Sequence, residues 1–172
     1  MKAVVQILFL LAVAFFVFPS HVCAQEKMFD SAVLTGAGRQ AYQSLLKVKL
    51  FAIGGIGYGG RTSDGEEAFD VLLAEKYASS AFKSLLDEAT IEGGMYGLLG
   101  LKIIDCDCYE SELSSFLLAR TDEHNKESFK TQSGCLVADA KSSDEKSQMI
   151  NYIVVEGFEQ FKKMKLQRRI AK

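Results

Sequence analysis

The feature that most constrains the fold is a long apolar stripe in the middle of the chain, which recurs at helical spacing. Charged and small polar side chains occupy the opposite face, as in a helix that buries one side against a core. The stripe consists of Phe69, Leu72, Leu73, Tyr77, Ala81, Phe82, Leu85 and Leu86. Ser63 and Glu66 have the spacing of a capping box, so we expect the helix to begin there and to break near Tyr77. A stripe of this length needs a second apolar element to cover it.

Residues 95–104 are apolar on nearly every side, which predicts a second helix that is buried all round. A turn is expected before it, at residues 90–94. Gly97 and Gly100 lie three positions apart on this helix, and their missing side chains would let another helix approach closely.

Other segments are shorter but have the same character. Helices are predicted up to about Leu46, over residues 109–118 and over residues 149–165. On the last of these, the residues expected to face inward are Ile150, Ile153, Val154, Phe158 and Phe161. Residues 47–53 also alternate well enough to form a strand, so that stretch stays open. A short strand-like piece is predicted at residues 135–137, directly after Gly134. The sequence therefore predicts a mainly α fold, a single domain of antiparallel helical hairpins with a small β element near Cys135.

Residues 1–24 have the features of a signal peptide. Lys2 supplies the positive start and a long apolar stretch follows, ended by Pro19, the only proline in the 172-residue chain. Small or β-branched residues before Gln25 predict cleavage at that position, which leaves residues 25–172 as an exported domain, periplasmic or secreted. The alternative is an uncleaved membrane anchor, because the apolar stretch could just span a bilayer.

Three cysteines remain after such cleavage: Cys106, Cys108 and Cys135. In an oxidising compartment one disulfide and one leftover thiol are expected. A bond between Cys106 and Cys108 looks awkward with one residue between them, so we predict that Cys135 pairs with one of the two. A zinc site of three thiolates and His124 is the alternative, but structural zinc sites usually have two to four residues between paired cysteines. No bound metal is therefore expected.

Residues 54–60 are the most unusual stretch, because five of the seven are glycine. They contain a G-x-G-x-x-G pattern, but dinucleotide binding requires the helix to open directly from it, and here the helix waits until after Ser63. We therefore expect no cofactor. The stretch is interpreted as a structurally permissive loop that could contact a partner through Gly54, Gly55, Gly57, Tyr58, Gly59 and Gly60.

Charge and histidine content bear on function. The net charge of −2 argues against a nucleic-acid partner. His124 is the only histidine after residue 24, and no nucleophile motif accompanies it, so no catalytic residue is predicted. Residues 162–172 hold six basic residues and no acid. This tail is interpreted first as a solvated end of the chain, with contact to an anionic surface as the functional alternative.

The hairpin formed by the stripe ending Phe82, Leu85 and Leu86, the turn at residues 87–94 and the apolar run 95–101 resembles HEAT-like helical repeats. The resemblance covers about a third of the chain and implies a surface for proteins or peptides without chemistry of its own. We therefore expect an exported non-catalytic binding or structural protein of the cell envelope, with an envelope protein or peptide as partner. The alternative is a hydrolase-like envelope enzyme that uses His124 or an acidic residue beside the glycine-rich loop.

Overall fold

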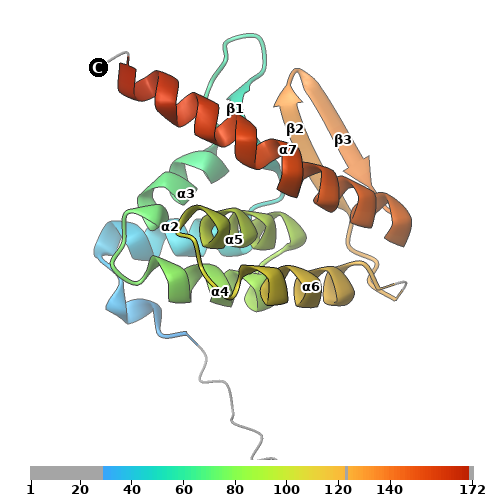
Figure 1. Ribbon diagram of the computed structural model, residues 1–172, viewed down its shortest axis with the longest axis horizontal. Coiled ribbons are helices and arrows are strands. Elements are labelled where there is room, and N and C mark those ends of the chain that lie inside the picture. The colour runs from blue at the N-terminus through green and yellow to red at the C-terminus, as the bar shows by residue number, and fades with distance from the viewer. Residues whose placement is uncertain (1–28, 123, 171–172) are drawn as a thin grey trace, which may run out of the picture.

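The computed structural model describes residues 29–122 and 124–170, so the predicted signal peptide lies outside the described residues. Within them the chain is mainly helical with a small three-stranded sheet, which confirms the predicted fold class (Figure 1). The elements are η1 (Ser31–Val33), α2 (Gly36–Lys47), β1 (Phe51–Ile56), α3 (Asp64–Leu73), α4 (Ala78–Glu88), α5 (Ile91–Ile103), α6 (Tyr109–Arg120), β2 (Phe129–Gly134), β3 (Leu136–Ala140) and α7 (Ser143–Ile170). None of the helices searched in this part of the chain is long and apolar enough to cross a membrane.

The apolar stripe forms α3 and α4, and the expected break near Tyr77 separates them. Ser63 caps α3 as predicted, since its Oγ accepts the N–H of Glu66 at 3.0 Å. The carboxylate of Glu66 makes a contact that the capping box did not predict. It accepts the N–H of Gly54 at 2.7 Å, which ties the start of α3 to β1.

Helix α5 is the centre of the core, and its apolar face extends all round it as predicted. The expected turn at residues 90–94 is wrong, because Thr90 caps the helix through the N–H of Gly93 at 3.2 Å and α5 begins at Ile91. Gly97 and Gly100 do allow a close approach. A Cβ on Gly97 would lie 2.8 Å from the carbonyl oxygen of Phe82, in the backbone of α4.

The sheet has the order β1-β2-β3, with β1 parallel to β2 and β2 antiparallel to β3. The β element near Cys135 is therefore a hairpin. Residues 47–53, for which the sequence left helix or strand undecided, contain the start of β1. Buried Glu92 on α5 accepts the N–H of Lys130 at 2.9 Å and so holds the beginning of β2 against the helical layer. Burial raises the pKa of the Glu92 carboxyl, although its bond to Lys130 opposes the shift.

Helix α7 crosses one face of the sheet, and α3 and α5 pack against the sheet from the helical side (Figure 1). It begins at Ser143, several residues before the predicted start. The reason is local, because the carboxylate of Glu145 accepts the N–H groups of Lys141 and Ser142 at 3.0 and 3.1 Å and so organises the first turn.

Candidate functional site

A groove with about 280 Å³ of free space lies between α7 and the sheet. The helix packs on β1 and β3, and the middle strand β2 lies beneath the groove. The strands contribute Phe51, Ile53, Thr131, Gln132, Ser133, Leu136 and Ala138, and α7 contributes Met149, Tyr152, Ile153 and Glu156. The groove is therefore built from segments that are far apart in the sequence.

The local structure explains why these side chains meet. Strand side chains alternate between faces, and the register sets Phe51 beside Thr131 and Thr131 beside Ala138, so one row crosses the sheet toward α7. The four α7 residues are spaced i, i+3, i+4, i+7, which puts them on one helical face. Sequence reasoning placed only Ile153 on an inward face and missed the rest. That helical spacing, with Tyr152 and Glu156 inside the apolar stripe, was the signal that could have identified them.

The chemistry of the groove is amphipathic. Its apolar walls include Ile53, Leu136, Met149 and Ile153, while Thr131 and Ser133 on β2 supply hydroxyl groups. Among the residues whose side chains the structure describes, Glu156 is the single charged one in the lining, and no lysine or arginine lines the groove. The volume is just below the range of roughly 300–1,000 Å³ that is usual for small-molecule sites. The groove can therefore hold a small apolar body, and its polar groups favour an uncharged or cationic head over an anionic one.

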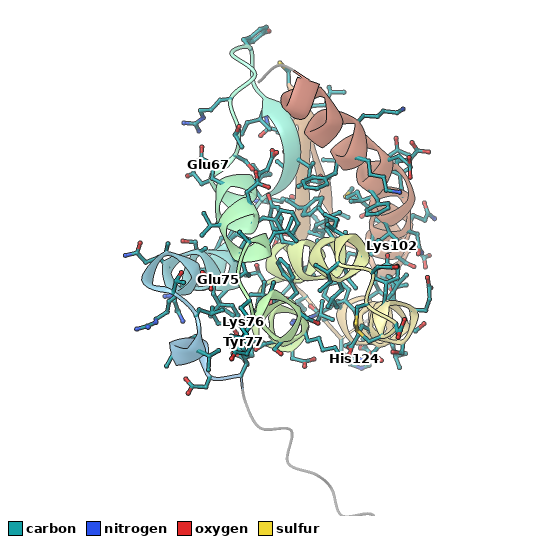
Figure 2. The ribbon with its side chains drawn as sticks, turned by 60° about the vertical axis from the view of Figure 1, so that its left-hand side comes forward. Glu67, Glu75, Lys76, Tyr77, Lys102 and His124 are labelled. Carbon is teal, nitrogen blue, oxygen red and sulfur yellow. A yellow bond between two sulfur atoms is a disulfide. The ribbon has the colours of Figure 1, made fainter. Side chains whose placement is uncertain are left out.

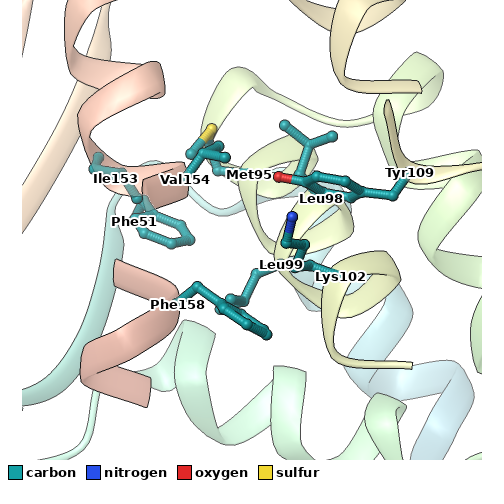
Figure 3. Close-up of a pocket in the computed structure, with 9 residues that line it drawn as sticks. All are labelled: Phe51, Met95, Leu98, Leu99, Lys102, Tyr109, Ile153, Val154 and Phe158. Carbon is teal, nitrogen blue, oxygen red and sulfur yellow. The ribbon is translucent and has the colours of Figure 1, made fainter. Parts of the chain in front are cut away.

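A second cavity, between α5, α6 and α7, has a different character (Figure 3). Its free space is about 10 Å³, about the room for one water molecule, so it is a gap in the core and holds no ligand. The ammonium of Lys102 points into it and lies 4.1 Å from the ring centre of Tyr109 (Figure 3). Burial, with a smaller contribution from Glu110, raises the pKa of Tyr109 to about 12, so the phenol stays protonated beside the lysine.

A buried polar cluster joins β1 to α3 and α5. The hydroxyl of Tyr96 donates to the carbonyl oxygen of Ala52 at 2.8 Å and accepts the N–H of the same residue at 3.1 Å. The Ser63 hydroxyl donates to that carbonyl as well, at 3.0 Å. Burial raises the pKa of the Tyr96 hydroxyl. The cluster faces the interior, and its described bonds fasten an edge strand to the helices, which is a structural role.

The loop in the glycine-rich stretch is shorter than predicted. Gly54 and Gly55 belong to β1, because the strand continues to Ile56, and only residues 57–60 form a turn, which we call the glycine turn. Gly57 and Gly60 both have positive φ, at 66° and 60°, as such a tight reversal requires. The predicted contact residues Gly57, Tyr58, Gly59 and Gly60 are all exposed. The Tyr58 ring is fully in solvent, at 103 % relative exposure.

The cysteines pair differently from the prediction. Cys106 is bonded to Cys108, and Cys135 is an exposed free thiol on the β2–β3 turn. The prediction failed because the chain reverses sharply between α5 and α6, with Asp105 at a φ of 56°. This turn brings the two Cα atoms to 5.1 Å, a separation common in disulfides. Within the described residues, no group of three or more potential ligands could hold a metal ion.

His124 lies away from these features, at the lower end of the molecule (Figure 2). Its ring is 96 % exposed, and its Nδ1 lies 2.9 Å from a carboxylate oxygen of Asp122. The backbone and ring hydrogen bonds from His124 lower the pKa of Asp122. The described contacts give this histidine a partner in its own loop, and the structure brings it neither to the groove nor to the glycine turn.

No protein-family model matches the chain, and the searches of curated proteins and of solved structures find no match either. The resemblance to HEAT-like repeats therefore rests on its residue pattern alone, and the function has to be argued from the residues of this chain.

Proposed function

We propose that this protein is an exported, non-catalytic binding protein of the cell envelope and that the groove between α7 and the sheet is its binding site. The N-terminal sequence supports export, because residues 1–24 have the order of charge, apolar run and small residues found in signal peptides. The proposed ligand is a small amphiphile with an apolar body and an uncharged or cationic head.

The groove is the observation that carries the proposal. It combines free space, apolar walls and a few polar groups, which is the usual composition of a small-molecule site. The other cavity described above has free space of only about 10 Å³, which is too small for such a ligand. Glu156 on the groove lining selects the head group, because an anionic head would lie near its carboxylate.

Titration with the uncharged dye N-phenyl-1-naphthylamine tests the site, since its fluorescence rises in an apolar environment. We expect saturable binding with a dissociation constant on the order of 10 µM, as expected for a probe of this size. Ala138→Trp should weaken binding at least about tenfold, because the indole would occupy the groove. Val137→Trp is the matched control. It is the neighbouring position on the opposite face of β3 and should leave binding unchanged.

Competition resolves the head-group preference. Dodecyltrimethylammonium should displace the dye at a lower concentration than dodecyl sulfate, and Glu156→Gln should reduce that difference. Absence of saturable binding, or equal binding by the two tryptophan variants with native circular dichroism, would show that the groove is not the site.

A further inference from the structure

One end of the molecule gathers exposed apolar side chains and basic residues from three separate segments. The glycine turn, the β2–β3 turn and the C-terminal end of α7 all lie at the upper end in both views (Figures 1 and 2). The two turns also touch, because the N–H of Gly57 donates to the carbonyl oxygen of Gly134 at 2.9 Å. We call this end the turn end of the molecule.

The apolar part of the turn end is unusually exposed. Tyr58 is at 103 % relative exposure on the glycine turn, and Leu136 and Val137 are at 80 % and 62 % beside the β2–β3 turn. Tyrosine is enriched where proteins meet the membrane surface, because its ring suits the apolar side of the interface and its hydroxyl the wet side. Aliphatic side chains on a neighbouring hairpin would enter the same layer.

The charged part comes from α7. Lys162 and Lys163 are exposed, and the sequence from Lys162 to the chain end contains six basic residues and no acid. Arg61, directly after the glycine turn, is exposed as well. The nearest acid along the helix, Glu159, lies 3.6 Å from the Lys162 ammonium and offsets only one of these charges. The basic residues also complement the negative end of the helix dipole, but that effect needs only one or two of them.

We propose that the turn end docks the protein on the surface of an anionic phospholipid bilayer, with Tyr58, Leu136 and Val137 entering the interface and Lys162 and Lys163 of α7 contacting the headgroups. Either contribution alone gives weak binding, whereas an apolar insertion combined with a polybasic segment gives stable attachment. Charge complementarity selects the occupant, because the segment is basic while the chain as a whole is slightly acidic.

The test is co-sedimentation of the protein with lipid vesicles. The full chain is expressed, and the protein is used after any N-terminal cleavage that the cells carry out. The readout is the ratio of binding to vesicles with about 30 % phosphatidylglycerol over binding to pure phosphatidylcholine. Binding that residues 1–28 add equally to both kinds of vesicle cancels in this ratio. We expect strong preference for the anionic vesicles, which decreases when salt rises from about 0.05 M to about 0.5 M.

Variants locate the contact. Lys162→Glu with Lys163→Glu should lower anionic-vesicle binding at least about 25-fold, at roughly fivefold for each basic residue. Tyr58→Ser should lower it several-fold. Lys76→Glu and Tyr77→Ser are matched controls, because both side chains are exposed at the lower end of the molecule (Figure 2) and should leave binding unchanged.

Equal binding to neutral and anionic vesicles, or no binding to either, would overturn the proposal. So would a loss caused equally by the control variants. A loss with the lysine pair but none with Tyr58→Ser would indicate a general attraction to polyanions and would also contradict docking through the turn end. None of the substituted residues lines the groove, so these results are independent of the dye titration.

Discussion

Gly93→Ala tests how closely α2 and α5 pack. A Cβ at Gly93 would lie 2.2 Å from the carbonyl oxygen of Leu45 and 2.7 Å from the Cβ of Ala89. The first neighbour is backbone, so α2 and α5 would have to separate by about 1 Å to restore an ordinary contact. That movement would also weaken the bond from the N–H of Thr90 to the carbonyl oxygen of Leu46, 3.3 Å long in the native packing.

The magnitude follows from three contributions. Overpacking costs about 1–3 kcal/mol, a weakened hydrogen bond adds about 1 kcal/mol, and the higher helix propensity of alanine returns at most about 1 kcal/mol. We expect a net destabilisation of about 1–3 kcal/mol, which lowers Tm by roughly 3–9 °C in a domain of this size. Far-UV circular dichroism during heating measures the shift.

Gly36→Ala is the control, because it is also in the first turn of a helix but has no neighbour within 4 Å of its built Cβ. It should leave Tm unchanged or raise it by up to about 3 °C. If Gly93→Ala is as stable as the parent, the close approach of α2 to α5 is not part of the folded protein and the reasoning fails.

Further predictions concern the turn, a buried acid, the chain start and the thiols. Gly57→Ala should lower the unfolding free energy by about 1–2 kcal/mol, because alanine resists positive φ, whereas Gly59→Ala, with free space and no positive φ, should change it by less than about 0.5 kcal/mol in urea unfolding. Burial raises the pKa of Glu92 in the folded protein above its ordinary value of 4.5. Glu92 therefore contributes its full stabilisation to the fold below that value, and the contribution is lost as the pH rises through the raised pKa. Glu92→Gln should therefore flatten the stability curve in that range, and an unchanged curve would contradict the assignment. N-terminal sequencing of protein from the native host should begin at Gln25, and retention of residues 1–24 would indicate an anchor. Alkylation of that unreduced, denatured protein should modify Cys135 alone, whereas three modified cysteines would contradict the disulfide.

The helices could be predicted because their signals are local. An apolar stripe, a cap such as Ser63 and a break such as that near Tyr77 each involve residues a few positions apart. The parallel pairing of β1 with β2 could not, because it joins Phe51 to Thr131 across most of the helical part of the chain. The same holds for Arg120 on α6, whose guanidinium donates to three carbonyl oxygens at the end of α4. No sequence pattern relates an arginine to carbonyls that far away.

The disulfide error has a different origin. The argument from compartment and cysteine number was sound for one bond and one thiol, and the structure has that count among Cys106, Cys108 and Cys135. Pairing depends on where the backbone turns, and the left-handed conformation at Asp105 is unusual for a residue other than glycine. The sequence between two helices does not show such a reversal.

The groove illustrates why a binding site is harder to predict than the helix that forms it. Sequence periodicity placed Ile153, Val154 and Phe158 on the inward side of α7, and all three do face other elements. Val154 and Phe158 meet α5 across a gap of about 10 Å³, whereas Ile153 also faces about 280 Å³ beside the sheet. The apolar pattern is the same for both walls, because it indicates only that a side chain is buried on folding. The volume left over depends on how a twisted sheet diverges from a straight helix that touches its first and third strands, and that divergence is a property of the assembled layers.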